Sequence, residues 1–339
     1  MPIQIEQGAA TFLTESERDC IALLQWALPH LNHRWEGYRR VRRQICRCIA
    51  ARIQALGLPD VAAYRTRLEE DPAEWTALRF CLRVTVSRFF RDQGMFHALA
   101  QSILPALAEM ANKAPRRKQR DINCAFTIRW LSASLRPKGR GIKPAEIKSG
   151  AETLRAWSAG CASGEEPYSL SLLWTFALQA RWPGLRLSIL ATDIDEGMLR
   201  RAEMACYPAS SLKEAPSNWL EPAFVRDNGR FCLHPELRVP VRFLRQDLCE
   251  ELPDGSFHLI LCRNLAFTYF AEPLQQEIAR GLLERLIPGG CLILGAHERL
   301  PAGSGSIAAK GQTAGIYWKT ASGVAAAQED APAALGQRE

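Results

Sequence analysis

The stretch that decides the fold is "WSAGCASGEEPYSL", which runs from Trp157 to Leu170. Apolar residues typical of a strand lead into a turn of small residues, and a predicted helix begins at two glutamates. Small residues in such a turn let the backbone approach a ligand closely. Because ligands of parallel α/β sheets bind at the carboxyl ends of the strands, this stretch predicts a binding site at the turn.

Around this stretch, predicted strands and helices alternate. Strands are expected over residues 154–160, 186–194, 257–264, 291–298 and 314–320, and helices over 165–182, 196–206 and 272–290. Strands that alternate with helices across short turns predict a parallel sheet with helices on both faces. The predicted fold is therefore an α/β, Rossmann-like sheet domain over residues 151–320.

Residues 208–246 interrupt this alternation. The sequence "GRFCLHPELRVPVRFL", residues 229–244, favours short antiparallel strands, and "DNG" at 227–229 is a strong hairpin turn. We expect a small antiparallel β-subdomain inserted into the sheet domain.

Residues 1–112 are predicted to form an all-α N-terminal domain. Apolar residues recur at helical spacing at Val41, Ile45, Ile49, Ile53 and Leu56, and the segment "LGLPD" ends this helix. Its other faces are rich in arginine, because residues 34–52 hold seven arginines and one glutamate. A solvated helix face is one interpretation, and a surface that attracts an acidic partner is the other.

The charge of the chain is uneven. Residues 113–150 contain eleven Lys or Arg residues and two acidic residues, a net charge of +9, whereas the whole chain carries +7. Together with its prolines and glycines, this composition is typical of a solvated linker or insertion, although a nucleic-acid-binding segment would look similar. Residues 321–339 are mostly small and polar, and we expect a disordered tail.

The sequence contains no pattern typical of a metal site, a disulfide framework or a membrane span. Its eleven cysteines are scattered without a CxxC pair, which predicts reduced thiols in a cytoplasmic protein. No apolar run reaches the roughly 18 residues that a transmembrane helix needs. The polar N-terminus does not resemble a secretory signal or a transit peptide.

The two glutamates in the turn indicate which cofactor binds there. A dinucleotide pyrophosphate prefers bare amides at a helix N-terminus, and Glu165 and Glu166 would repel it. The carboxylates suit S-adenosylmethionine (SAM), which has an ammonium group, a sulfonium and ribose hydroxyls. Asp193 follows the second strand, with Asp195 as a spare, and Asp247 follows another strand that ends near "RQDL", residues 245–248. One such acid can equally be a helix cap, but three at successive strand ends indicate a nucleoside site.

Four stretches together resemble one family. They are "VSRFFRD" at 86–92, the stretch quoted first, "ATDIDEGMLRRA" at 191–202 and "CRNLAFTYF" at 262–270. They occur in the same order as in the CheR family of chemoreceptor methyltransferases. The resemblance spans roughly residues 20–320, apart from the basic segment. It implies a class I methyltransferase domain with an inserted β-subdomain, a helical N-terminal domain and SAM as the cofactor, without a metal.

The resemblance also implies an activity, the formation of methyl esters on glutamate side chains of chemoreceptor coiled coils by a cytoplasmic monomer. The cofactor-binding residues that it implies are Thr85, Ser87, Arg91, Glu166, Asp193, Asp247, Leu248, Cys262 and Arg263. The implied docking surface for acidic receptor helices is formed by Arg39, Arg43 and Arg47. Tyr269 matches the tyrosine that lines the family's transfer site.

Five features depart from the family pattern. Thr85 replaces the usual asparagine, Ser87 a threonine, and Asp247 another asparagine. The run "CRNLAFTYF" is one residue longer than usual, so Tyr269 matches only with one inserted residue. The basic segment 113–150 has no counterpart.

The expected reaction needs no general base, because a glutamate with a reference pKa of about 4.3 is already ionised at neutral pH. Catalysis then consists mainly of holding the attacking oxygen and the methyl group in near-attack geometry. We assign the orientation of the carboxylate to Arg91 and Tyr269. A structural salt bridge is the other interpretation of Arg91.

Two other functions stay open. A methyltransferase of the same fold could act on RNA or on a small carboxylic acid, and the charge of the basic segment motivates the RNA alternative. The sequence "CRNLAF" argues against it, because nucleic-acid amino-methyltransferases commonly carry Asn or Asp, two prolines and an aromatic residue there. A protein that senses SAM without transferring its methyl group is the second alternative, and the intact Arg91 and "CRN" argue against it.

Overall fold

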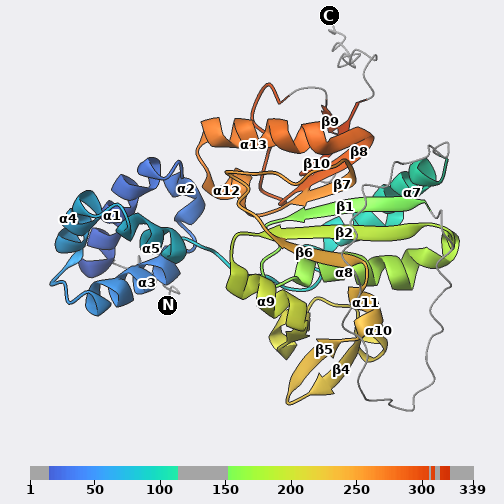
Figure 1. Cartoon of the computed structure of the whole chain (residues 1–339), viewed down its shortest axis with the longest axis horizontal. Helices are drawn as coiled ribbons and strands as arrows, with labels where there is room; N and C mark the ends of the chain where they lie inside the picture. The colour runs from blue at the N-terminus through green and yellow to red at the C-terminus, as the bar shows by residue number, and fades with distance from the viewer. Residues whose placement is uncertain (1–14, 114–151, 305–306, 310–313, 321–339) are drawn as a thin grey trace, which may run out of the picture.

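The computed structural model describes residues 15–113, 152–304, 307–309 and 314–320. Nearly all of the predicted basic linker and the whole predicted tail, 321–339, lie outside these ranges, so both stay predictions. The described residues form a unit of short helices beside a larger domain built on a twisted sheet (Figure 1).

The larger domain contains a seven-stranded sheet with the order β6-β2-β1-β7-β8-β10-β9. Five strands run parallel, namely β1 (Thr153–Ala159), β2 (Arg186–Asp193), β6 (Val241–Arg245), β7 (Phe257–Cys262) and β8 (Leu286–Leu294). The last two strands, β9 (Ile307–Ala309) and β10 (Ile316–Lys319), are antiparallel. The predicted Rossmann-like sheet is confirmed.

Helices cover both faces of this sheet, as the central strand shows. Leu154 and Ala156 of β1 share a core with α8 (Glu165–Leu173) and α7 (Leu104–Lys113). Trp157 and Ala159 share a different core with α13 (Glu272–Arg285). Successive side chains of a strand point to opposite faces, so a central strand with two covered faces carries apolar residues on both of them.

The remaining elements of this domain follow the predicted alternation with two differences. After α8 come η2 (Trp174–Leu178), η3 (Gln179–Arg181) and, beyond β2, α9 (Glu196–Met204). The predicted helix 272–290 ends at Arg285, and Leu286–Gly290 instead forms the first part of β8. The pairing of this part with β7 is irregular, and Gly289 has a positive φ of 76° there. The helix α12 (Ala266–Tyr269) and the strand β9 were not predicted.

The β-subdomain contains three antiparallel strands in the order β3-β5-β4. They are β3 (Cys206–Tyr207), β4 (Phe224–Asp227) and β5 (Arg230–Leu233). Asn228 and Gly229 connect β4 to β5 with φ values of 46° and 75°, which confirms the hairpin predicted from "DNG". Short helices complete this region, namely η4 (Ala209–Leu212), α10 (Ser217–Ala223) and α11 (Pro235–Arg238). Residues 241–245, which were expected in the antiparallel subdomain, instead form β6 and pair in parallel with β2 of the main sheet.

The helical unit contains α1 (Glu15–His30), α2 (Trp35–Tyr38), α3 (Arg42–Ala55), α4 (Val61–Glu70) and α5 (Glu74–Cys81). The predicted apolar side of α3 is confirmed, because Ile45, Ile49 and Ile53 are buried in the core of this unit. Gly57, with a φ of 67°, follows the end of α3 as expected.

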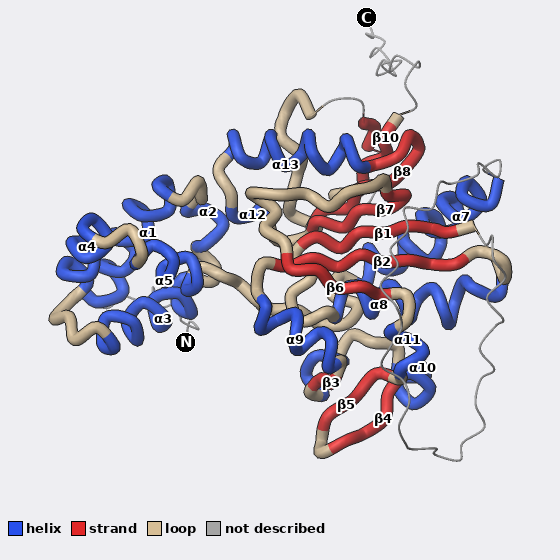
Figure 2. The backbone as a smooth tube through the Cα atoms, viewed as in Figure 1, coloured by secondary structure: helices blue, strands red, loops and turns tan. Residues whose placement is uncertain are grey.

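The helices after this unit pack on the sheet. These helices are α6 (Gln93–Ala98), η1 (Leu99–Ile103) and α7. Phe89, Phe96 and Leu104 share one core with the buried residues of β1. Figure 2 shows α7 beside the sheet, away from α1–α5. The sequence assigned residues 1–112 to one helical domain, whereas the core of α1–α5 ends at Leu82. Helical periodicity identifies a buried face but does not say which core buries it.

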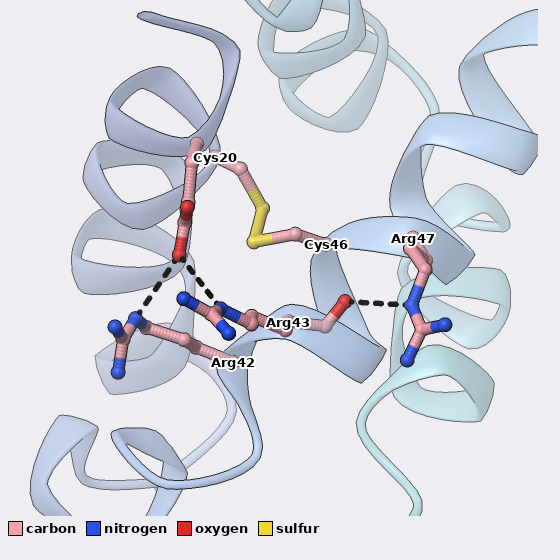
Figure 3. Close-up of a disulfide and its surroundings, with 6 residues drawn as sticks. Cys20, Arg42, Arg43, Cys46 and Arg47 are labelled. Atoms are coloured by element: carbon pink, nitrogen blue, oxygen red, sulfur yellow. Dashed lines mark hydrogen bonds and ion pairs between the residues drawn. A yellow bond between two sulfur atoms is a disulfide. The ribbon is translucent and has the colours of Figure 1, made fainter. Parts of the chain in front are cut away.

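Six cysteines form disulfides, so the prediction that all eleven are reduced thiols is wrong. Cys20–Cys46 joins α1 to α3 (Figure 3), Cys48–Cys81 joins α3 to α5, and Cys206–Cys232 joins β3 to β5. The partners are 26, 33 and 26 residues apart in the sequence, so no short spacing motif marks them. The argument from reduced cysteines to the cytoplasm is lost with this prediction.

Within the described ranges, none of the helices is both long enough and apolar enough to span a membrane.

Candidate active site

The turn after β1 lies at the carboxyl end of the parallel strands. Gly160, Ala162 and Gly164 all have positive φ, at 75°, 47° and 89°. A Cβ atom on Gly160 would lie 2.4 Å from Leu265 Cδ2, and one on Gly164 would lie 2.8 Å from the Cβ of Ala202. Glycine is required at both positions by backbone conformation and by space, which explains the small residues in this turn.

The two glutamates that begin α8 have different surroundings. Glu165 is buried, and its carboxylate accepts a hydrogen bond from Ser163 Oγ at 2.8 Å. Glu166 accepts from Ser158 Oγ at 2.7 Å and from Arg263 Nη1 at 3.0 Å, and it is only partly buried. Glu165 is therefore part of the turn, whereas Glu166 fits the predicted contact with a cationic cofactor.

Arg263 connects three elements at this end of the sheet. Its buried guanidinium pairs with Glu166 through Nη1 and with Asp92 through Nη2, at 3.0 and 2.9 Å. The same Nη2 donates to the backbone carbonyl of Arg91 at 3.0 Å. The guanidinium thus fixes the end of β7 to α8 and to the segment that precedes α6. Cys262, beside it, is fully buried in the core, so a cofactor contact at this position would involve its backbone.

The acids after β2 have separate tasks. Asp193 accepts hydrogen bonds from the amides of Ala162 and Asp195 at 2.8 and 2.9 Å, so it fastens the turn after β1 to the end of β2. Burial raises the pKa of Asp193, and these two amides oppose the rise. Asp195 caps α9 by accepting from the amide of Met198 and forms an ion pair with Arg83 at 3.0 Å. Asp193 therefore stays the predicted ribose ligand, and Asp195 has the role of a helix cap.

The third predicted acid follows β6. Asp247 accepts from the backbone amide of Cys249 at 2.9 Å. Leu248 packs against the core that contains Trp157 and α13. The amide of Gln246 donates to the backbone carbonyl of Asp193 at 3.0 Å, which holds the ends of β2 and β6 together. The structure thus brings Glu166, Asp193 and Asp247 to the same edge of the sheet.

The segment that leads from the helical unit to α6 is fastened at its second half. The amides of Phe89 and Phe90 donate to the carbonyl of Ser211 and to Ser169 Oγ, both at 2.9 Å. Thr85 and Ser87, in the first half, are partly exposed and form no hydrogen bond with another described residue. Their hydroxyls are available to a ligand, as their predicted role requires.

Arg91 ends this segment. Its Nη1 donates to the carbonyl of Val86 at 2.9 Å, and no described carboxylate forms an ion pair with it. Burial raises the pKa of the Tyr269 phenol, and the nearby charge of Arg91 opposes the rise. The structural salt bridge considered for Arg91 is therefore absent from the described residues, and its charge lies close to Tyr269.

Tyr269 lies where the helical unit meets the sheet domain. Arg34 donates from Nη2 to the carbonyl of Phe267 and from Nε to that of Thr268, at 2.5 and 3.1 Å, while its own amide donates to the carbonyl of Tyr269 at 2.9 Å. The ring centroids of Tyr38 and Tyr269 lie 4.8 Å apart. A Cβ atom on Gly37 would lie 2.2 Å from the carbonyl oxygen of Thr268.

We call residues 32–38 with 267–271 the joint. No pattern in the sequence indicates the joint, because its two halves are more than 200 residues apart and its contacts involve mostly backbone atoms. Through the joint, the helical unit contacts Tyr269 directly.

The predicted docking arginines lie on the outside of the helical unit. Arg39, Arg43 and Arg47 are exposed. Arg39 pairs with Glu36 at 3.8 Å, Arg43 pairs with Glu17 at 3.8 Å, and Arg47 donates to the carbonyl of Arg43 at 3.3 Å. Figure 3 shows Arg43 and Arg47 on α3. Exposed pairs this long contribute little to stability, so these charges are available to a partner. We call Arg39, Arg43 and Arg47 the arginine face.

Arg52, on the same helix, has a structural role instead. Its Nε and Nη2 donate to the buried carboxylate of Glu74, at 2.9 and 2.7 Å, and the Tyr64 hydroxyl donates to the same carboxylate at 2.9 Å.

No group of three or more described His, Cys, Asp or Glu side chains is arranged to hold a metal ion.

The profile of the CheR methyltransferase SAM-binding domain matches residues 138–315, just over half of the chain. The chain belongs to the CheR methyltransferase family. The matched range contains the turn after β1, all three acids at the sheet edge, Arg263 and Tyr269. SAM is therefore the cofactor of this class I methyltransferase domain, as the acids at the strand ends predicted. The segment with Arg91 and the arginine face lie before the matched range.

Named relatives extend the similarity. A chemotaxis protein methyltransferase of Listeria innocua is 33% identical over 219 residues, which are 65% of this chain and 67% of that protein. One of Salmonella typhimurium is 29% identical over 273 residues, 78% of each chain. An uncharacterized 104.1 kDa protein of Rhodobacter capsulatus is 28% identical over 75% of this chain, which spans 23% of that protein's length.

Proposed function

We propose that this CheR family member is a SAM-dependent O-methyltransferase that forms methyl esters on glutamate side chains of chemoreceptor proteins. The observation that carries the proposal is Arg91, a cation without a carboxylate partner among the described residues, whose charge opposes the rise in the pKa of Tyr269. A guanidinium and a phenol both suit an incoming carboxylate, because both groups donate hydrogen bonds to its oxygens.

When bound, SAM supplies a methyl group activated by a sulfonium. Glu166, Asp193 and Asp247 would hold its polar groups, and Thr85 and Ser87 would close over it. Arg91 and Tyr269 would orient the substrate carboxylate for in-line attack. Neither residue needs to accept a proton, because the glutamate is already ionised at neutral pH.

The arginine face supports an acidic helical partner. Arg43 and Arg47 lie on α3, and Arg39 directly follows Tyr38 of the joint, so a helix docked on these arginines would lie on the unit that contacts Tyr269. This function implies a location in the cytoplasm, where receptor signalling helices lie, and a monomer is expected. The RNA alternative gains no support from the described residues, since the segment that motivated it lies outside them.

The proposal is tested by incubating the protein with tritiated SAM and receptor-containing membranes, and then treating the products with mild alkali. Volatile, base-released methanol is expected, because methyl esters hydrolyse under these conditions. Alkali-stable label in RNA, or no label in protein, would contradict the proposal.

A further inference from the structure

Glu298 is a buried carboxylate that lies outside the predicted site residues. It follows β8 and is 2% exposed. Its Oε2 accepts from the amides of Asn264 and Gly295, both at 2.7 Å, and its Oε1 accepts from the amide of Leu265 at 3.1 Å and from Thr268 Oγ1 at 2.6 Å. A buried charge is costly unless it is hydrogen-bonded, and four donors surround this one.

Three of these four donors belong to the loop between β7 and the end of α12. Asn264 has a φ of 54°, a left-handed conformation that residues other than glycine rarely adopt. The packing around the carboxylate is close, because a Cβ atom on Gly295 would lie 2.8 Å from Glu298 Oε2 and 2.6 Å from Asn264 Nδ2. The carboxylate thus offsets the energetic cost of the left-handed backbone at Asn264 and restricts the conformations open to the loop.

The two ends of this loop carry the groups assigned to the site. Arg263 precedes Asn264 and is held independently by Glu166 and Asp92. Tyr269 follows Thr268, whose hydroxyl is bonded to Glu298. We propose that Glu298 is a positioning residue for methyl transfer, because its carboxylate fixes the loop at Asn264, Leu265 and Thr268 and so places the Tyr269 ring. This inference rests on the role proposed for Tyr269.

Substitutions at Thr268 test the inference with little disturbance. Thr268→Val removes the hydroxyl at nearly constant shape, and Thr268→Ser keeps it. We expect kcat to fall about tenfold in Thr268→Val, which is the effect of losing one hydrogen bond to a charged group, and to stay within about twofold in Thr268→Ser. In Glu298→Gln two donors lose their acceptor, and kcat should fall on the order of 100-fold.

Two further measurements separate positioning from general support of the fold. The Kd for SAM, measured by calorimetry, and the KM for the receptor should stay within about threefold of wild type, because Arg263 and the arginine face keep their own contacts. In a Tyr269→Phe background, Thr268→Val should cause little additional loss of kcat, since both changes act through the same group. A purely structural role would leave the two losses additive.

The outcomes distinguish this inference from the proposed function. Equal kcat in Thr268→Val and Thr268→Ser, or additive losses with Tyr269→Phe, would overturn the positioning role of Glu298. Full activity of Tyr269→Phe would overturn the role of the tyrosine and with it this inference. Absence of base-labile label from the wild-type protein would overturn the proposed function itself.

Discussion

The edge of the sheet and the arginine face are both rich in charged side chains, but they hold these charges differently. At the sheet edge, Glu166, Asp193 and Arg263 each have partners within 3.0 Å. On the arginine face, the contacts of Arg39, Arg43 and Arg47 are 3.3 to 3.8 Å long and exposed. The first region is preorganised for one small molecule, whereas the second can adapt to a larger partner through long-range attraction.

Arg91 belongs to neither of these two regions, and its removal should have the largest effect on kcat. Arg91→Ala removes the proposed donor to the reacting carboxylate, so we expect kcat to fall on the order of 100- to 1000-fold. Arg88→Ala is the matched control, because that residue is three positions away and pairs with Glu214 at 3.3 Å instead. Similar kcat values for the two variants in the tritium assay would contradict the assignment of Arg91.

At the edge of the sheet we expect the next largest effect, a loss of affinity for SAM. Asp193→Ala should weaken SAM binding roughly 100-fold, because it removes the predicted ribose acceptor and also the link between Ala162 and the end of β2. Asp195→Ala should change the Kd for SAM by less than about threefold and lower stability by about 1 kcal/mol, as expected for a helix cap. Calorimetric titration and thermal unfolding of both variants check this contrast.

At the arginine face we expect a smaller effect, limited to the KM for the protein substrate. Reversal of Arg39, Arg43 and Arg47 to glutamate should raise the KM for the receptor about tenfold or more and leave the Kd for SAM unchanged. Wild-type KM should rise with ionic strength, and the reversed variant should lose this dependence. Reversal of Arg67, an exposed arginine of α4, is the control. An equal rise in KM for this control would show that total charge, rather than the face, matters.

The smallest expected effect concerns the joint. Burial lowers the pKa of His33 to about 4, with the charge of Arg79 acting in the same direction and that of Asp247 opposing it. Because the folded pKa lies below the ordinary value of 6.5, His33 contributes stability above pH 6.5 that is lost as the pH falls toward 4. In His33→Gln the free energy of unfolding should therefore fall by about 1 kcal/mol less between pH 7 and pH 4 than in wild type. This value allows for the partial exposure of the side chain. Chemical denaturation between pH 4 and 7 measures the difference, and parallel profiles would refute it.

Local sequence patterns predicted the sheet, the hairpin and the acids at the strand ends. These features depend on neighbours in the chain, since a strand, its turn and the next residue are specified together. The turn after β1 illustrates this, because Gly160, Gly164 and Glu166 lie within seven positions.

The features that the sequence did not reveal depend on distant partners. Glu298 bonds to residues about 30 positions earlier, and Arg34 to residues more than 230 positions later. The cysteine pairs were missed for the same reason, as their partners come together only when α1, α3 and α5 pack. The core that buries α6 and α7 is likewise set by tertiary packing rather than by periodicity.

The lack of space at Gly37 bears on how this enzyme could be retargeted. A chimera whose seam lies after Leu82 would bring in a foreign version of residues 32–38, and any side chain at position 37 would collide with the carbonyl of Thr268. A graft limited to the outward positions of α3 avoids this collision, because it leaves the packing beside Tyr269 untouched. New receptor specificity should therefore be easier to install by exchanging a helix surface than by exchanging a whole domain.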